Sequence, residues 1–477
     1  MVFASQIFLF AFLPAVLVLY YATGRRGRAP VLLAASYFFY AWGAPQFVLI
    51  LLAGTYFDFV IARLMVKRED PQARKALLVL SVAVNLGILG YYQYAGFFVT
   101  GFYDLLKWAE LVDYRNVLQI ALPIGISFFT FHKLSYVIDV YRGTVQPMQR
   151  FSLFAIYVAF FPQLVAGPIV RYNQIADQLV ARSHTLDKFF DGIVRFCFGL
   201  GKKVLIANVL GRTADAMLGQ PAGVLTWGGG WLAMLCYTFQ IYFDFSGYSD
   251  MAVGLGKMFG FTLPENFNQP YVSRSITEFW RRWHMSLSAW FKDYLYIPLG
   301  GNRVSSGRTY LNLWIVFLLC GLWHGANWTF VAWGCYHGLW LVIERAYLLK
   351  RLERLPAVVT IPSTFIVVLL GWVLFRAPDV AHALSLLQTM FSPSAATIFA
   401  RPLGDFFDTK VFVVLAAAAA LSFHSAVIGA LPQSIRDAAA PAGRNVWARG
   451  CAAVSLFALA WAALASGSFN PFIYYRF

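Results

Sequence analysis

Apolar runs long enough to cross a bilayer recur along the whole chain, separated by short polar segments. A membrane-spanning helix needs about 20 residues, and tilted or buried helices can be shorter. The pattern therefore predicts an all-α, multi-pass membrane protein with about a dozen helices. The apolar runs lie near Ile7–Tyr21, Phe47–Met65, Leu77–Tyr92, Val117–Val137, Phe151–Val165, Gly230–Phe243, Trp328–Ile343, Val358–Leu374, Val411–Val427 and Ala452–Ala465.

Neither a linker nor an internal repeat divides the chain. We therefore expect one transmembrane domain over residues 1–477, with N-terminal helices in 1–115, a core that carries the unusual motifs in about 118–345, and C-terminal helices in 358–477. Within the core, "FPQLVAGPIVRY" (161–172) is interrupted by proline and glycine, which indicates a re-entrant segment.

Composition and charge agree with a membrane protein and add its orientation. The chain is 60% hydrophobic and only 13% charged, whereas about a quarter of the residues of a soluble protein are charged. The net charge of +16 comes largely from lysines and arginines in short loops such as 24–28, 67–75 and 350–354. The positive-inside rule places these loops in the cytoplasm and the N-terminus outside. The basic charge is thus a topology signal and does not indicate nucleic-acid binding.

Residues 275–300, "SITEFWRRWHMSLSAWFKDYLYIPLG", show a different pattern. Aromatic residues recur at helical spacing, and most basic residues fall between them. This predicts a continuous amphipathic helix lying in the membrane plane. His284 would lie on this helix, one turn from Trp280 and Arg281.

A histidine interrupts the apolar stretch "LCGLWHGANWTF" (319–330). From Tyr310 to Trp323 we expect about 14 residues of helix, or about 21 Å, which is shorter than the membrane core of about 30 Å. His324 would then lie at membrane depth, where a break is tolerated only if it is buried in protein or lines a cavity. An ionisable residue at that depth indicates a functional site. The alternative is a structural histidine bonded to a backbone carbonyl.

Other polar motifs are less specific. In "YFDFSGYSDMAVGLGKMFGF" (242–261), Asp244 and Asp250 would need partners such as Arg or Tyr, and Ser246 lies between them. Histidines and cysteines show no spacing typical of a metal site. The G-x-S-x-G motif of a hydrolase serine is also absent.

Several of these segments together resemble the membrane-bound O-acyltransferase family, and within it the bacterial alginate O-acetyltransferase branch. The resemblance implies a ring of helices around a central funnel or tunnel, with openings from both sides meeting near a catalytic histidine. It implies that this histidine is His324 and that His284 is the second signature position. The segments are "LPIGISFFTFHKLSYVIDVYRG" (122–143), "FPQLVAGPIVRY" (161–172), "YFDFSGYSDMAVGLG" (242–256), "ENFNQPYVSRSITEFWRRWHMSLSAWFKDYLYIPLGGNR" (265–303) and "GLWHGANWTFVAWGCYHG" (321–338).

The resemblance also implies a reaction. An acetyl group passes from a cytoplasmic thioester, acetyl-CoA, to a hydroxyl at the outer side of the bacterial inner membrane, with no bound cofactor or metal. The acceptor would be an exopolysaccharide such as alginate, reached directly or through a periplasmic SGNH-hydrolase-like acetyltransferase and other polysaccharide assembly proteins.

Within this reaction, a neutral imidazole at His324 suits deprotonation of the acceptor. Asn327 could support the oxyanion. His284, together with Arg281 and Arg282, would position the donor. We further expect Trp280, Asp244 and Ser246 to support the site.

Three alternatives remain open from the sequence. A related branch transfers D-alanine from a carrier protein to teichoic acid. A transporter or flippase could use His324 and the aspartates as a proton relay. A scaffold of a polysaccharide export complex would need these polar residues only for structure.

Overall fold

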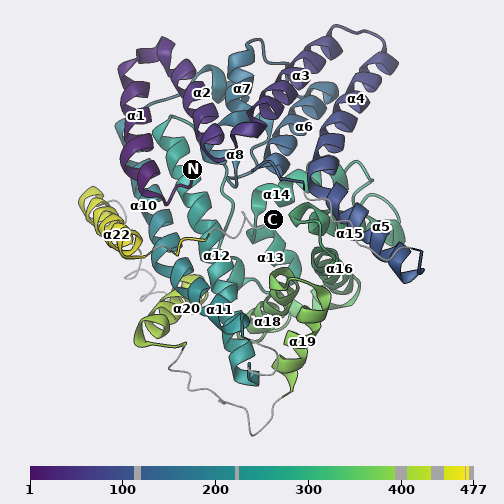
Figure 1. The fold of residues 1–477 in the computed structure, drawn as a ribbon, viewed down its shortest axis with the longest axis vertical. Helices are drawn as coiled ribbons and strands as arrows, with labels where there is room; N and C mark the ends of the chain where they lie inside the picture. The colour runs from purple at the N-terminus through teal and green to yellow at the C-terminus, as the bar shows by residue number, and fades with distance from the viewer. Residues whose placement is uncertain (112–119, 221–224, 393–405, 431–444, 468, 472–477) are drawn as a thin grey trace. The chain divides into compact units, whose positions relative to one another are not determined.

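The computed structural model describes residues 1–111, 120–220, 225–392, 406–430, 445–467 and 469–471. These residues form helices joined by loops, without a strand among them, so the all-α prediction is confirmed (Figure 1). The chain divides into two compact units. Unit 1 contains residues 1–192 and 255–264, and unit 2 contains residues 193–254 and 265–477.

Five helical segments within the described residues are long and apolar enough to cross a membrane, and shorter apolar helices accompany them. Both units contribute such segments, which agrees with a multi-pass membrane protein. The five segments are Pro45–Val66, Pro71–Trp108, Ala357–Arg376, Thr409–Ala426 and Val446–Ser466.

Unit 1 is built mainly from the N-terminal helices. Figure 1 shows α3 and α4 side by side, with α6 packed against both. The predicted interruption at 161–172 is present as the short α8 followed by a loop. The elements are η1 (Phe8–Phe12), α1 (Leu13–Ala22), α2 (Gly24–Gly43), η2 (Pro45–Phe47), α3 (Val48–Val66), α4 (Pro71–Leu89), η3 (Gly90–Tyr94), α5 (Ala95–Trp108), α6 (Ile126–Arg142), α7 (Phe151–Ala159), α8 (Phe161–Leu164), α9 (Tyr172–Val180) and the start of α10 (Leu186–Gly201).

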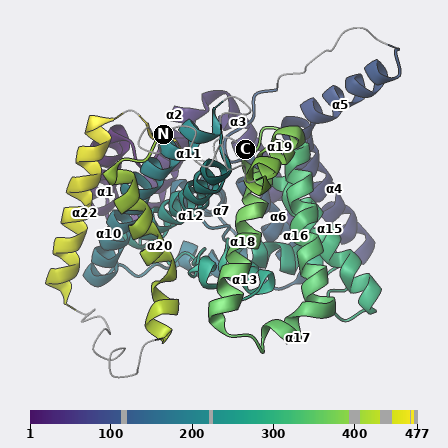
Figure 2. The same ribbon diagram turned by 90° about the horizontal axis from the view of Figure 1, so that it is seen from below.

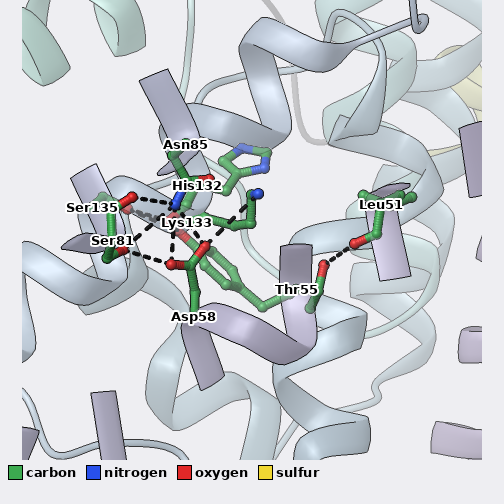
Figure 3. Close-up of polar contacts among 9 residues, drawn as sticks. Leu51, Thr55, Asp58, Ser81, Asn85, His132, Lys133 and Ser135 are labelled. Atoms are coloured by element: carbon green, nitrogen blue, oxygen red, sulfur yellow. Dashed lines mark hydrogen bonds and ion pairs between the residues drawn. The ribbon is translucent and has the colours of Figure 1, made fainter. Parts of the chain in front are cut away.

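A buried polar cluster connects three helices of unit 1 (Figure 3). The Asp58 carboxylate on α3 accepts hydrogen bonds from Ser81 Oγ (2.6 Å) and Asn85 Nδ2 (2.9 Å) on α4. Lys133 Nζ on α6 lies 3.7 Å from the same carboxylate. A Cβ at Gly54 would come within 2.7 Å of Lys133 Nζ, so the glycine leaves room for the lysine. Because a buried charge needs a partner, this cluster holds α3, α4 and α6 together.

Unit 2 contains His284 and His324 together with the segments around them. Figure 2 shows α15, α16 and α18 side by side, and α16 packs against both of the other two. The elements are η4 (Lys202–Ala207), α11 (Asn208–Leu218), α12 (Trp227–Met258), η5 (Pro270–Val272), α13 (Ile276–Arg282), α14 (Met285–Phe291), η6 (Lys292–Tyr296), α15 (Ser306–His324), α16 (Trp328–Ile343), η7 (Glu344–Leu348), α17 (Leu349–Leu352), α18 (Ala357–Arg376), α19 (Val380–Phe391), α20 (Thr409–Ala430) and α22 (Val446–Ser466). The last turn of α12 belongs to unit 1.

Two expectations about unit 2 are wrong. The amphipathic helix at 275–300 is not continuous, because α13 ends at Arg282 and α14 begins at Met285. The aromatic residues that suggested one amphipathic face are largely buried inside the unit. In addition, α15 begins at Ser306 and has 19 residues, so it is about 28 Å long and not short for a membrane. Its end at His324 comes from the residues that follow, and not from a lack of length.

The cluster around Asp58 makes a prediction about stability. Lys133→Met leaves a buried carboxylate without its cation and should cost about 3 kcal/mol of stability or more, seen as a lower midpoint of thermal unfolding in detergent. Lys133→Met combined with Asp58→Asn removes both charges and should recover much of that loss. Lys75→Met, on the exposed surface of α4, is the control and should leave the midpoint unchanged. Equal loss in the single and double variants would contradict a charge pair.

Candidate functional site

His324 is the last residue of α15, and the chain turns back directly after it. Gly325 has an extended backbone, and α16 begins at Trp328. A Cβ at Gly325 would lie 2.4 Å from the Phe330 ring. A side chain at this position would collide with the ring, which explains the glycine. The predicted break is confirmed by the extended backbone of Gly325.

Glycines also set how closely α15 and α16 approach one another. A Cβ at Gly321 would lie 2.3 Å from the Phe330 carbonyl oxygen, and one at Gly334 would lie 2.4 Å from the Phe317 carbonyl oxygen. The two backbones therefore touch at these positions, as expected for helices that associate inside a membrane. This contact fixes the imidazole at the end of α15 relative to α16.

Aromatic rings surround the His324 imidazole, which is only 4% exposed. Its ring centroid lies 4.8 Å from that of Trp323, 5.1 Å from Trp333 and 5.1 Å from Phe375, each at a steep interplanar angle. Edge-to-face contacts of this kind are favourable and fix ring orientation. His324 is therefore held in one place by three elements, α15, α16 and α18.

His284 lies in the interruption between α13 and α14, and its backbone is left-handed, with a φ of +44°. A left-handed residue other than glycine is uncommon and often marks a functional site. Asn266 holds the following turn, because its carbonyl accepts from Met285 N (2.9 Å) and its side chain accepts from Ser286 N (3.2 Å) and Ser286 Oγ (2.9 Å). The kink turns the His284 side chain into the buried interior of unit 2.

The two signature histidines meet at one indole ring. The His284 centroid lies 6.0 Å from that of Trp323 and 4.7 Å from Phe245, and Trp323 also contacts His324. The structure thus brings together two residues 40 positions apart. Their catalytic roles stay predictions, but their proximity is what those roles require.

The residues expected to assist His284 have separate surroundings. Trp280 packs against Phe317 (5.2 Å), Trp333 (5.6 Å) and His337 (5.1 Å), so it belongs to the aromatic shell. Arg281 and Arg282, on the same short helix, line a polar cavity of about 760 Å³. Its other lining residues are Asn268, Arg274, Ser275, Thr277, Glu278, Leu349, Leu352 and Glu353.

Asn327 caps α16. Its Oδ1 accepts from Thr329 N (3.0 Å), and its Nδ2 donates to the Pro378 carbonyl (2.8 Å) just after α18. These bonds give Asn327 a structural task, and an oxyanion role for it stays a prediction. A cavity of about 280 Å³ lies at this end of α18, lined by Leu218, Gln220, Leu225, Arg376, Ala377, Pro378, His382, Ser385, Leu386 and Thr389.

Asp244 forms a buried ion pair. Its Oδ1 lies 2.6 Å from Lys203 Nζ, and both side chains are at most 3% exposed. Lys203 also donates to Asn208 Oδ1 (2.9 Å) and to the Pro471 carbonyl. Asp244 therefore helps to join α12, η4 and Pro471. The sequence offered no signal that its partner would be this lysine.

Asp250 and Ser246 complete the polar positions of α12. Asp250 pairs with Arg195 (2.6 Å) and Lys202 (2.6 Å), which confirms the expectation of an arginine partner. Ser246 is 1% exposed, and its hydroxyl has no hydrogen-bond partner among the described residues. It follows Phe245, the residue that contacts His284.

Sequence reasoning missed most of the aromatic shell. Trp333, Trp372, Phe375 and His337 are all nearly or fully buried, and they contact one another around His324. In the sequence they read as ordinary residues of apolar helices. Spacing on α16 could have linked Trp333 with His337, but no pattern connects them to α18.

The protein contains apolar helices that are able to cross a membrane, and two buried imidazoles pack on one indole ring. Together these features define a helical membrane protein whose candidate site contains groups that can transfer protons. A sequence model of the membrane-bound O-acyltransferase family matches residues 102–375. The chain belongs to this family and is an O-acyltransferase, which confirms the resemblance seen in its motifs.

Relatives with assigned names cover most of the chain. A protein named "probable alginate O-acetylase" from Pseudomonas aeruginosa is 49% identical, over 82% of this chain and 75% of its own. One of the same name from Azotobacter vinelandii is 42% identical over the full length of both chains. A peptidoglycan O-acetyltransferase from Helicobacter pylori is 38% identical, over 82% of this chain and 80% of its own.

The left-handed backbone at His284 predicts how substitutions there behave. His284→Asn and His284→Val both remove the imidazole, but asparagine tolerates the left-handed region and a β-branched residue does not. The Val variant should be less stable than the Asn variant by about 1–2 kcal/mol, measured as the difference between their thermal unfolding midpoints in detergent. Equal unfolding midpoints of the two variants would contradict a left-handed backbone at residue 284.

Proposed function

We propose that this protein transfers an acetyl group from a cytoplasmic thioester, acetyl-CoA, for O-acetylation of an extracytoplasmic polysaccharide such as alginate. The observation that carries the proposal is the meeting of His324 and His284 at Trp323. The acetyl-transferring names of the relatives support the choice of acyl group. We place the protein in the bacterial inner membrane with its N-terminus outside, because its basic loops mark the cytoplasmic side.

The two cavities lie at opposite ends of α18, and neither His324 nor His284 is among the residues that line them. Arg274 lines the larger one and donates to the Leu355 carbonyl (2.5 Å) and Thr360 Oγ1 (3.2 Å) at the start of α18. Arg376, at the end of α18, lines the smaller one. Helix α18 has 20 residues. It is therefore about 30 Å long, which is the thickness of a membrane core. Phe375, which touches His324, is near the end with the smaller cavity.

This arrangement supports a separate compartment for each substrate. The basic segment 350–354 adjoins the larger cavity and marks it as cytoplasmic. Arg281 and Arg282 there suit the phosphates of coenzyme A, and the thioester arm would extend toward His284 and His324. The acceptor would enter from the smaller, outer cavity.

The chemical step needs a base and a path for its proton. As the acceptor oxygen bonds to the thioester carbonyl carbon, its proton passes to a ring nitrogen of neutral His324. The carbon–sulfur bond then breaks, and the sulfur leaves with the electron pair. The imidazolium of His324 returns the proton to that thiolate, which gives an acetyl ester, free thiol and a neutral histidine. His284 would hold the thioester in reach.

The acceptor hydroxyl can belong to the polysaccharide itself or to a relay protein. In the second case, a periplasmic SGNH-hydrolase-like acetyltransferase would take the acetyl group and pass it to the polymer, together with other polysaccharide assembly proteins. The same site could use a D-alanyl carrier and teichoic acid. A transporter or a scaffold would need no acyl chemistry.

His324→Ala should abolish acetyl transfer, with a loss of at least about a hundredfold, because the general base is removed. The measurement is the transfer of labelled acetyl from acetyl-CoA in inside-out vesicles, together with the O-acetyl content of the exopolysaccharide made by the cells. His424→Ala, an exposed histidine on α20, is the matched control and should retain activity.

Different outcomes of these measurements distinguish acetyl transfer from the alternative functions. Wild-type transfer by His324→Ala would exclude the assigned base. Transfer from a D-alanyl carrier, but not from acetyl-CoA, would favour the teichoic acid reaction. Polysaccharide movement in proteoliposomes without any ester formation would favour a transporter. The absence of both activities would favour a scaffold.

The donor cavity makes a separate prediction. Arg281 is exposed and forms no ion pair among the described residues, whereas Arg282 pairs with Glu278 (2.9 Å). Arg281→Gln should therefore raise the KM for acetyl-CoA several-fold with little change in kcat, and added salt should reduce the difference from wild type. Arg351→Gln, exposed and outside the cavity lining, is the control. An unchanged KM would remove Arg281 from the donor site.

A further inference from the structure

Basic side chains from three segments of unit 1 converge beside Tyr20, near the end of α1. They form the cationic cluster, which consists of Arg28 on α2, Arg182 and His184 in the loop before α10, and Lys188 on α10. Arg28 Nη1 lies 3.2 Å from His184 Nδ1, and Lys188 Nζ donates to the Gly260 carbonyl (2.7 Å). The segments that meet here are therefore fixed by hydrogen bonds as well as by chain packing.

The hydrogen bonds of Tyr20 and Arg28 with His184 fit the tautomer that carries its proton on Nε2. The Tyr20 hydroxyl donates to the Phe259 carbonyl (3.0 Å) and lies 2.9 Å from His184 Nε2. With its proton used in this way, the hydroxyl accepts from His184 Nε2–H, which leaves Nδ1 as the acceptor for Arg28. Burial lowers the pKa of His184, and the charges of Arg28 and Arg182 lower it further. A neutral His184 thus orients the Arg28 guanidinium.

No carboxylate among the described residues lies within ion-pair distance of Arg28, Arg182 or Lys188. Burial lowers the pKa of Arg182, and the charge of Arg28 acts in the same direction. Buried donors also remain, because Arg28 Nε and Arg182 Nη1 have no hydrogen-bond partner among the residues that the structure describes. Cations and donors gathered in this way match the oxygens of a phosphate group.

An apolar groove begins next to the cationic cluster. It has a volume of about 540 Å³ and lies between α1 and α2, lined by apolar side chains from Ile7 to Leu19 on one side and from Val31 to Trp42 on the other. Leu19 precedes Tyr20, and Val31 follows Arg28 by three residues, so the groove ends at the cluster. From Ile7 to Leu19 the helix rises about 18 Å, close to half of a membrane core of about 30 Å.

We propose that unit 1 binds one anionic phospholipid, with its phosphate at the cationic cluster and an acyl chain in the apolar groove. A polar head joined to a chain about one leaflet long fits the two features in their observed order. Basic pockets between helices on the cytoplasmic side of membrane proteins are typical sites for anionic lipid head groups.

The rings around Arg28 favour a lipid over a free phosphate ion. The Arg28 guanidinium lies 5.5 Å from the Tyr20 ring centroid and 5.4 Å from that of Tyr21. Tyr21 is 37% exposed, and exposed tyrosines are enriched at the level of the head groups in a membrane, which supports a lipid phosphate as the anion. A free ion would gain nothing from the groove.

The test uses the full-length protein purified in detergent, with binding followed by the shift of its thermal unfolding midpoint. Phosphatidylglycerol should raise the midpoint, whereas phosphatidylcholine and inorganic phosphate should not. Arg28→Gln with Arg182→Gln should weaken the apparent affinity for phosphatidylglycerol by about tenfold or more, because two cations near the phosphate are lost. The matched control, Arg25→Gln with Arg26→Gln, removes two exposed charges from the same helix and should bind as wild type does.

A groove variant keeps the proposal testable if the arginine variant does not fold. Ala34 is exposed and lines the groove, so Ala34→Trp should fill it and remove the response to phosphatidylglycerol while the cationic cluster stays intact. Three results would overturn the proposal: equal stabilisation by inorganic phosphate, equal weakening in the control variant, or unchanged lipid binding by Ala34→Trp.

Discussion

The end of α15 at His324 is the constraint on which the rest of the site depends. A helix of 19 residues stops there because the backbone of Gly325 is extended, and Asn327 then caps the start of α16. Gly321 and Gly334 then let α16 pack directly against the backbone of α15. The imidazole is thus carried by two helices in contact and not by a free loop, so its position is set by backbone packing.

Aromatic packing transmits that position to the second histidine. Inside a membrane, apolar surface gives little drive for helices to associate, so shape and close contact have to provide it. Large rigid rings serve this purpose, and Trp323 contacts both His324 and His284. The left-handed kink at His284 is what brings the second imidazole to the same ring.

A buried charge needs a partner of opposite charge, and this protein shows two ways of providing one. Asp58 with Lys133 and Asp244 with Lys203 are buried pairs in which each ion has a partner on another element. These pairs hold helices together and need no ligand to be satisfied. The cationic cluster differs, because its cations meet each other without a described carboxylate. This difference distinguishes charges that stabilise the fold from charges that are suited to binding an external anion.

The sequence by itself determined the features that depend on neighbouring residues. Apolar runs predict helices, and His-Gly-Ala-Asn predicts the end of α15, since glycine and asparagine act on the backbone locally. It could not determine that the segment at 275–300 breaks at His284, that Lys203 is the partner of Asp244, or that Trp372 and Phe375 join the site. Each of these is decided by contacts between residues far apart in the chain, and local spacing carries no information about such partners.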